Sequence, residues 1–115
     1  MALKVLVSAY SCEPNRGSEP GIGWNWVCQL ARFNEVWVIT RNANREKIEA
    51  YLSNEPFREK MHFYYTDTTR LLWYRGPWIL DYVQYLRAYF WQWACYRLAK
   101  ELARERRFNA AIHIT

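Results

Sequence analysis

The stretch Lys4-Val-Leu-Val-Ser-Ala-Tyr-Ser-Cys-Glu-Pro-Asn-Arg-Gly-Ser-Glu-Pro-Gly-Ile-Gly-Trp-Asn-Trp26 decides the fold. Its apolar, β-branched start over 3–9 predicts a buried strand. A loop over 10–19 follows, and Ser18 is expected to cap a helix that runs to about Arg32. Strand, glycine-bearing loop and helix N-terminus, in this order, form a ligand-binding lip at the carboxyl end of the first strand of an α/β sheet.

The rest of the chain alternates strand and helix patterns. Further strands are predicted over 35–40, 61–66 and 110–115, helices over about 45–54 and 78–107, and a loop over 67–77. Right-handed crossovers between these elements predict a Rossmann-like, three-layer α/β domain. Its parallel sheet should have about four strands in the order 3-2-1-4, with helices on both faces. A doubly wound sheet usually continues past a fourth strand, so we expect the front half of something larger.

Two helices carry apolar faces in the sequence. Ile22, Trp26, Leu30 and Phe33 share one face of the first helix, and Asn44 is expected to cap the second helix. The long helix over 78–107 carries two neighbouring stripes, which are Tyr82, Leu86, Tyr89, Trp93 and Tyr96, and Val83, Phe90, Ala94, Leu98 and Leu102. Core packing with arginines that reach to solvent is the first interpretation, and a surface that meets membrane or lipid-linked substrate is the second.

Composition narrows the class of protein. The 115 residues suffice for one domain, and 16 Lys and Arg against 11 Asp and Glu give a net charge of +5. Three cysteines without CxxC spacing indicate neither a disulfide framework nor a zinc site, so a reducing cytoplasm is expected. The first residues lack the h-region and cleavage site of a signal peptide, and no apolar run reaches about 18 residues, so neither a signal peptide nor a membrane-spanning helix is expected. Charge alone is the sole support for nucleic-acid binding, and no nucleic-acid partner is expected.

Candidate site residues gather where parallel strands end. Gly21 and Gly23 would let a ligand approach backbone N–H groups at a helix start, or they serve a tight structural turn. His113 ends the fourth strand, where it could orient a sugar hydroxyl or carry a proton, or simply close the strand. His62 begins the third strand, away from the ligand edge, and is expected to be structural.

Charged residues follow the first and second strands. Glu13 and Glu19 flank the first loop, where carboxylates could bind sugar hydroxyls or act as acid and base, although most loop glutamates are solvated. Arg41 and Arg45 follow the second strand and could meet a phosphate, with solvation or a surface ion pair as the alternative.

Three segments carry a resemblance to a known family. The run from Lys4 to Pro14, the run Gly17-Ser-Glu-Pro-Gly-Ile-Gly-Trp-Asn-Trp-Val27 and the strand Glu35-Val-Trp-Val-Ile-Thr-Arg41 closely resemble the N-terminal domain of bacterial group 1 glycosyltransferases. These are retaining, metal-independent family 4 enzymes with the GT-B fold. The closing strand Ala111-Ile-His-Ile-Thr115 is similar to the last strand of the same segment. The resemblance covers nearly the whole chain and is loose over 45–107.

The resemblance implies a function in polysaccharide biosynthesis. Such enzymes move a sugar from a nucleotide-sugar to a glycan or lipid-linked acceptor, and the N-terminal domain mostly binds the acceptor. Ser18, Glu19, Gly21 and Gly23 would lie at the interdomain cleft, and His113 would lie near the reacting sugar. Arg41 is expected to bind substrate as well, on its place after the second strand rather than on the resemblance. No metal or other cofactor is implied. Residues 1–115 would form a truncated acceptor-side domain without the second, donor-binding domain, and would be inactive alone. The location would be cytoplasmic, with the inner face of the plasma membrane as an alternative.

A second interpretation needs no catalysis. The open sheet edge at Ile112–Ile114 could pair with a partner or with a second copy of the chain, which predicts a non-catalytic binding or self-association module.

Overall fold

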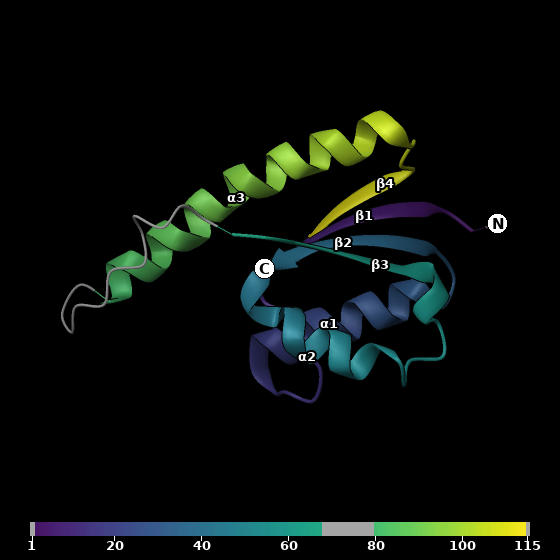
Figure 1. Ribbon diagram of the computed structural model, residues 1–115, viewed down its shortest axis with the longest axis horizontal. Coiled ribbons are helices and arrows are strands. Elements are labelled where there is room, and N and C mark those ends of the chain that lie inside the picture. The colour runs from purple at the N-terminus through teal and green to yellow at the C-terminus, as the bar shows by residue number, and fades with distance from the viewer. Residues whose placement is uncertain (1, 68–79, 115) are drawn as a thin grey trace.

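The computed structural model describes residues 2–67 and 80–114, with the side chains of 80–84 excepted (Figure 1). The strands and helices are β1 (Lys4–Ala9), α1 (Ser18–Ala31), β2 (Glu35–Arg41), α2 (Arg45–Leu52), β3 (Met61–Thr66), α3 (Leu80–Glu105) and β4 (Ala110–Ile114). Short 3-10 turns, η1 (Asn42–Asn44) and η2 (Arg58–Lys60), precede α2 and β3. Each predicted strand and helix is present, with ends within a few residues. The loop predicted over 67–77 lies outside the described residues, apart from Asp67.

The four strands form one parallel sheet in the order β3-β2-β1-β4, as predicted. β1 is central: Val5 pairs with Val36 of β2 on one side and with Ala110 of β4 on the other. The strand order reverses between β1 and β4, because the first two crossovers lead one way and the third leads back. The topological switch point of the sheet therefore lies between these two strands.

Helices cover the sheet on both faces (Figure 1). α1 and α2 connect β1 to β2 and β2 to β3 on one face, whereas α3 crosses the other face on its way to β4. A right-handed crossover places its helix on a face set by the direction of travel, so the reversal at β1 moves α3 to the opposite face. The fold is thus the Rossmann-like three-layer arrangement that the sequence predicts.

The larger core lies between the sheet and the helices α1 and α2. β2 is buried on both faces over Val36–Thr40, which explains its continuous apolar pattern. The buried members of this core come from β1, β2 and β3, from the loop after β1 and from both helices: Val5, Val7, Ala9, Cys12, Trp24, Val27, Ala31, Val36, Val38, Ile48 and Met61. Trp24 stacks on Phe63 at 5.8 Å between ring centres and meets Tyr51 edge-on.

The second core joins α3 to the opposite face of the sheet. Trp91 is only 1% exposed, donates its Nε1–H to the carbonyl of Thr66 at 3.1 Å and meets Tyr10 edge-on. Ile39, Cys95 and Leu102 are the other buried members. Among its described side chains, α3 therefore packs mainly through Trp91, Cys95 and Leu102, and several of its large aromatic side chains stay exposed.

Three local expectations are wrong. The predicted apolar face of α1 is largely exposed at Ile22, Trp26 and Phe33, because the helix turns its small residues and Trp24 toward the core. Ser18 is not the cap of α1, because Gly17 holds that position and no side chain caps the helix. Asn44 holds the N-cap position of α2, but its side chain makes no capping hydrogen bond, and its amide donates to Thr40 and to the carbonyl of Tyr10.

Apolar side chains remain exposed along α3. Leu86, Tyr89, Trp93 and Tyr96 of one predicted stripe are exposed, whereas Leu102 of the other stripe is buried and Phe90 is exposed. The side chains of Tyr82 and Val83 lie outside the described residues. Within residues 2–67 and 80–114, no helix has both the length and the hydropathy to cross a bilayer.

Candidate functional site at the switch point

Ser8 and His113 face each other across the switch point. The two residues are register partners on β1 and β4, so their side chains leave the same face of the sheet. Ser8 Oγ lies 2.7 Å from His113 Nδ1. Because Ser8 occupies Nδ1 and the residue is exposed, the ring can present its other nitrogen to a ligand.

A pocket of about 230 Å³ surrounds this pair. Gln92, Cys95 and Tyr96 of α3 close it from above, and Ser8 and His113 form its floor. Burial raises the pKa of the Cys95 thiol, and a hydrogen bond with Ser8 opposes that shift. The pocket thus holds a histidine and a serine within hydrogen-bond distance of each other, beside a protonated thiol.

The two glycines of α1 have a structural task. A Cβ on Gly21 would lie 1.7 Å from the carbonyl oxygen of Arg16, and a Cβ on Gly23 would lie 2.0 Å from that of Ser11. Both positions are buried against the loop that precedes the helix. The sequence suggested that a ligand approaches these glycines, but the backbone of this loop makes the close approach instead. The glycines therefore allow the loop to pack on the start of α1.

The loop itself has an unusual backbone. Asn15 and Ser18 have φ values of 58° and 62°, in the left-handed region that only glycine adopts without cost. The N–H of Glu13 donates to the carbonyl of Pro20 at 2.9 Å and closes the loop. Ser18 and Glu19 are exposed at the start of α1 and are open to a ligand.

Arg41 contacts Tyr10 of its own chain. Its Nε–H donates to the carbonyl of Tyr10 at 2.8 Å, and its guanidinium lies 4.0 Å from the centre of the Tyr10 ring. Asn44 donates to the same carbonyl at 3.2 Å. Burial raises the pKa of the nearby Asp67, and the charge of Arg41 opposes that shift. Arg41 therefore fixes the chain where β1 ends, and Arg45 lies over the ring of Tyr65.

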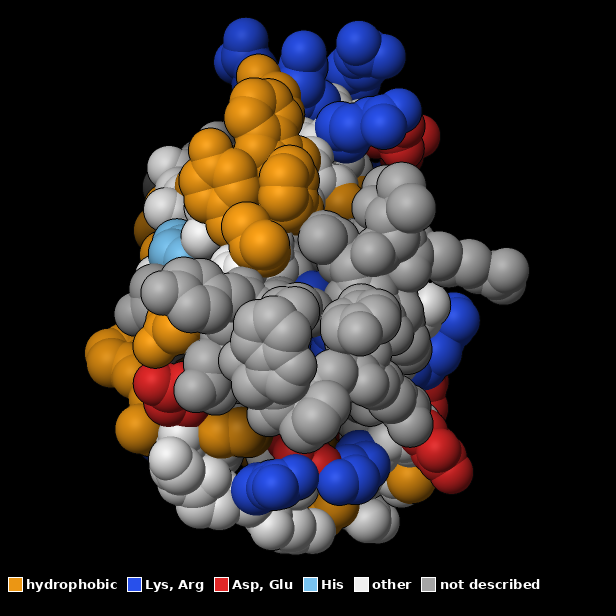
Figure 2. Space-filling view, turned by 90° about the vertical axis from the view of Figure 1, so that its left-hand side faces the viewer, with side chains coloured by type: hydrophobic (Ala, Val, Ile, Leu, Met, Phe, Trp, Pro, Cys, Tyr) orange, Lys and Arg blue, Asp and Glu red, His pale blue; other side chains and the backbone are white. Residues whose placement is uncertain are grey.

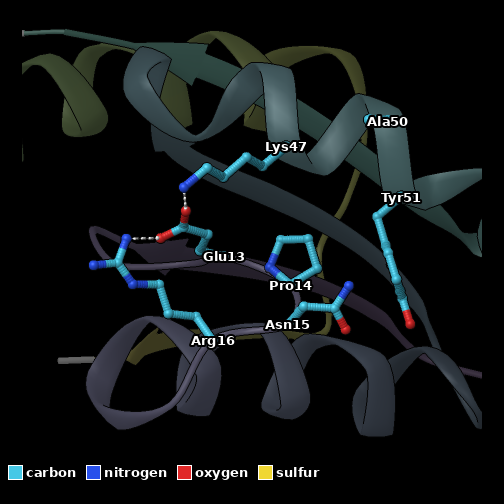
Figure 3. Close-up of a pocket in the computed structure, with 7 residues that line it drawn as sticks. All are labelled: Glu13, Pro14, Asn15, Arg16, Lys47, Ala50 and Tyr51. Carbon is cyan, nitrogen blue, oxygen red and sulfur yellow. Dashed lines mark hydrogen bonds and ion pairs between the residues drawn. The ribbon is translucent and has the colours of Figure 1, made fainter.

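The buried carboxylate of Glu13 forms an ionic cluster with two exposed cations, which the sequence did not reveal (Figure 3). Its two carboxylate oxygens accept from Lys47 of α2 and from Arg16 of the loop, the latter at 3.0 Å. These bonds, above all the one from Lys47, hold the pKa of Glu13 below its ordinary value. The cluster borders an open pocket of about 390 Å³ that is also lined by Asn15 and Tyr51. The one sequence signal for this cluster is the carboxylate of Glu13 in the loop. Its partner Lys47 is 34 residues away along the chain, so the pairing cannot be predicted from the sequence.

His62 lies away from the carboxyl edge, as expected. Its Nε2 lies 3.2 Å from the carboxylate of Glu35, and its ring stacks on Trp37. Within residues 2–67 and 80–114, no group of three His, Cys, Asp or Glu side chains is arranged to hold a metal ion.

We compared the chain with known protein families, curated proteins and solved structures. No protein-family model, curated protein or solved structure matches the chain.

Proposed function

We propose that this chain is the acceptor-side, Rossmann-like domain of a retaining glycosyltransferase with the GT-B architecture. The observation that carries the proposal is the Ser8–His113 pair at the switch point, because open α/β sheets bind their ligands there. The glycine-bearing lip after β1 and the resemblance of 4–27 and 35–41 to group 1 glycosyltransferases support it.

The reaction transfers a sugar from a nucleotide-sugar to a hydroxyl of a glycan or lipid-linked acceptor. His113 would hydrogen-bond a hydroxyl of the reacting sugar through the nitrogen that Ser8 does not occupy. Ser8 would hold the imidazole in one orientation, so that the ring is positioned before substrate binds. The reaction in this proposal uses no metal ion.

The first loop would face the donor diphosphate across a cleft. Ser18 and Glu19 are exposed there and could contact substrate directly. Gly21, Gly23 and Arg41 would act indirectly, because their contacts shape the loop and fix the end of β1. In this architecture a second Rossmann-like domain binds the donor, so transfer requires such a domain, in the same polypeptide or as a partner. Nucleotide-sugar donors place the reaction in the cytoplasm, with the inner face of the plasma membrane as the site of a lipid-linked acceptor.

The test uses the native polypeptide that carries this segment. It would be purified from its own cells with an antibody against residues 2–67, its mass determined, and nucleoside diphosphate release measured with a panel of nucleotide-sugars and a glycan extract. We expect release from at least one donor and a fall of about 100-fold or more in kcat for His113→Ala. Normal turnover by that variant, or no release from any donor, would contradict the proposal.

The open edge of β4 favours a second candidate function, a binding or self-association module. Ala110, Ala111, Ile112 and His113 are exposed, and β4 pairs only with β1 among the described strands. An unpaired edge next to an exposed isoleucine is suited to adding a strand from a second copy. Sedimentation equilibrium should then show a dimer that Ile112→Lys dissociates. A monomer at high concentration would exclude self-association through this edge.

A further inference from the structure

α3 carries an aromatic hollow on its exposed face. Tyr89, Trp93 and Tyr96 stand one and two turns apart, and together with Gln92 they line a depression of about 480 Å³. Trp93 is 59% exposed and the two tyrosines are exposed to a similar degree. Figure 2 shows hydrophobic side chains gathered over this part of the molecule, with Lys and Arg side chains next to them. The volume falls within the range of about 300–1,000 Å³ found for ligand sites.

The hollow adjoins the pocket at the switch point. Gln92 and Tyr96 line both, and the two adjoining depressions, from the aromatic rings of α3 to Ser8 and His113, are together called the groove. Rings with polar edges therefore lie at one end, an amide lies in the middle and a serine–histidine pair lies at the other end.

This combination fits a carbohydrate. A pyranose ring has an apolar face of C–H groups that stacks on Trp or Tyr, and hydroxyls at its rim that bond to amides, hydroxyls and imidazole. Tyr and Trp provide such amphipathic contact area, and a few polar groups set orientation. A helix that lies on a lipid surface inserts an apolar face, whereas this depression has the amide of Gln92 in its lining.

We infer that the groove binds a glycan, with one sugar unit stacked on Trp93 and Tyr96 and the chain running toward His113. The inference rests on the proposed function and deepens it, because it names a carbohydrate rather than a lipid as the part of the acceptor held by this domain. Tyr89 extends the stacking surface by one turn of the helix.

A glycan array tests the inference directly. The purified 115-residue chain would be applied to linear and branched oligosaccharides of neutral hexoses, N-acetylhexosamines and uronic acids, and each glycan that binds would be titrated by tryptophan fluorescence. Trp93→Ala should weaken binding at least tenfold, and Tyr96→Phe, which keeps the ring, should weaken it less than Tyr96→Ala. Trp26→Ala is the matched control, because Trp26 is 57% exposed on α1, on the opposite face of the sheet.

Three results would overturn the inference: an array without signal, equal affinities of the Trp93 and Trp26 variants, or co-sedimentation with phosphatidylglycerol vesicles that only Trp93→Ala abolishes, without glycan binding. The last result would identify a membrane surface instead. Urea denaturation of each variant establishes that a loss of binding is not a loss of fold.

The two proposals fail separately. Glycan binding that depends on Trp93, in a native polypeptide that releases no nucleoside diphosphate, would support the groove and contradict the transferase. The opposite result is sugar transfer that depends on His113 but is unchanged by Trp93→Ala, measured with the native glycan acceptor below saturation. It would support the transferase and contradict the glycan-binding groove.

Discussion

At the scale of single residues, Gly23 shows how a motif can be read correctly and explained wrongly. The sequence marks Gly21 and Gly23 as places of close approach, and the structure bears this out. The approaching atoms are carbonyl oxygens of the chain's own loop, 12 or fewer residues away in sequence, which no pattern of residue types distinguishes from a ligand. Arg41 likewise stands where a phosphate could bind, but its Nε–H and the face of its guanidinium contact Tyr10 of the same chain.

Gly23→Ala should therefore destabilise the fold. The new methyl group would meet the backbone carbonyl of Ser11, which cannot swing aside as a side chain would. We expect a loss of about 3 kcal/mol in the free energy of unfolding, the upper range for overpacking, measured by urea denaturation. Gly17→Ala is the matched control, because nothing lies within 4 Å of its Cβ position. Equal midpoints for the two variants would refute this account.

The cysteine thiols should be protected from alkylation. Burial raises the pKa of Cys12 and of Cys28 to about 12, so hardly any thiolate exists at pH 8 in the folded protein. Mass spectrometry after iodoacetamide treatment at pH 8 should show Cys12 unmodified in the native chain and modified within minutes in 6 M guanidinium. Rapid native labelling of Cys12 would show that the loop opens.

At the scale of elements, the strands and the sheet order follow from the sequence because buried parallel strands have a continuous apolar pattern. Helix faces are less well determined. In α1 the residues that contact the core include glycines and alanine, whereas the larger Ile22, Trp26 and Phe33 face outward, so the apolar pattern indicated the wrong side. In α3 aromatic residues lie on several sides of the helix, so the sequence does not indicate which of them is buried. Trp91 is buried because it contacts Thr66 and Tyr10.

Trp91 should anchor α3 and Trp93 should not, although only one residue separates them. Trp91→Ala removes a side chain that is 1% exposed and a hydrogen bond to Thr66, and should cost about 3–5 kcal/mol of stability. Trp93→Ala should shift the unfolding free energy by less than about 0.5 kcal/mol, because its side chain is largely exposed. Chemical denaturation followed by far-ultraviolet circular dichroism measures both. Similar losses of unfolding free energy for the two variants would show that Trp91 is not the residue that anchors α3 to the sheet.

At the scale of the whole molecule, stability should fall at both ends of the pH range. The pKa of Glu13 is lowered in the folded state, so its contribution is present above its ordinary pKa and is lost as pH falls through the folded value. The thiols of Cys12 and Cys28 act in the opposite sense. Their folded pKa values are raised, so folding binds protons that the unfolded chain releases above pH 9, and stability declines from there toward pH 12.

Glu13→Gln isolates the acid side of this profile. The variant should lose about 1 kcal/mol at pH 7, because Lys47 and Arg16 are largely exposed and regain water when the carboxylate is removed. The loss should disappear as pH falls through the lowered folded pKa of Glu13, because the wild-type carboxyl then becomes neutral as well. Thermal melts over a pH series from 7 downward provide the comparison, and a loss of the same size at every pH would exclude an ionic origin.

The central place of β1 has a consequence for the order of events during synthesis. β1 leaves the ribosome first and can pair with β2 after about 30 more residues, but its other neighbour, β4, lies 105 residues further along the chain. Until β4 emerges, one edge of β1 stays bare, and the Ser8 hydroxyl has no imidazole to meet. Among the strands of this sheet, chaperones that recognise exposed strands therefore have their longest opportunity at β1, and the switch-point site is the last part of the sheet to form.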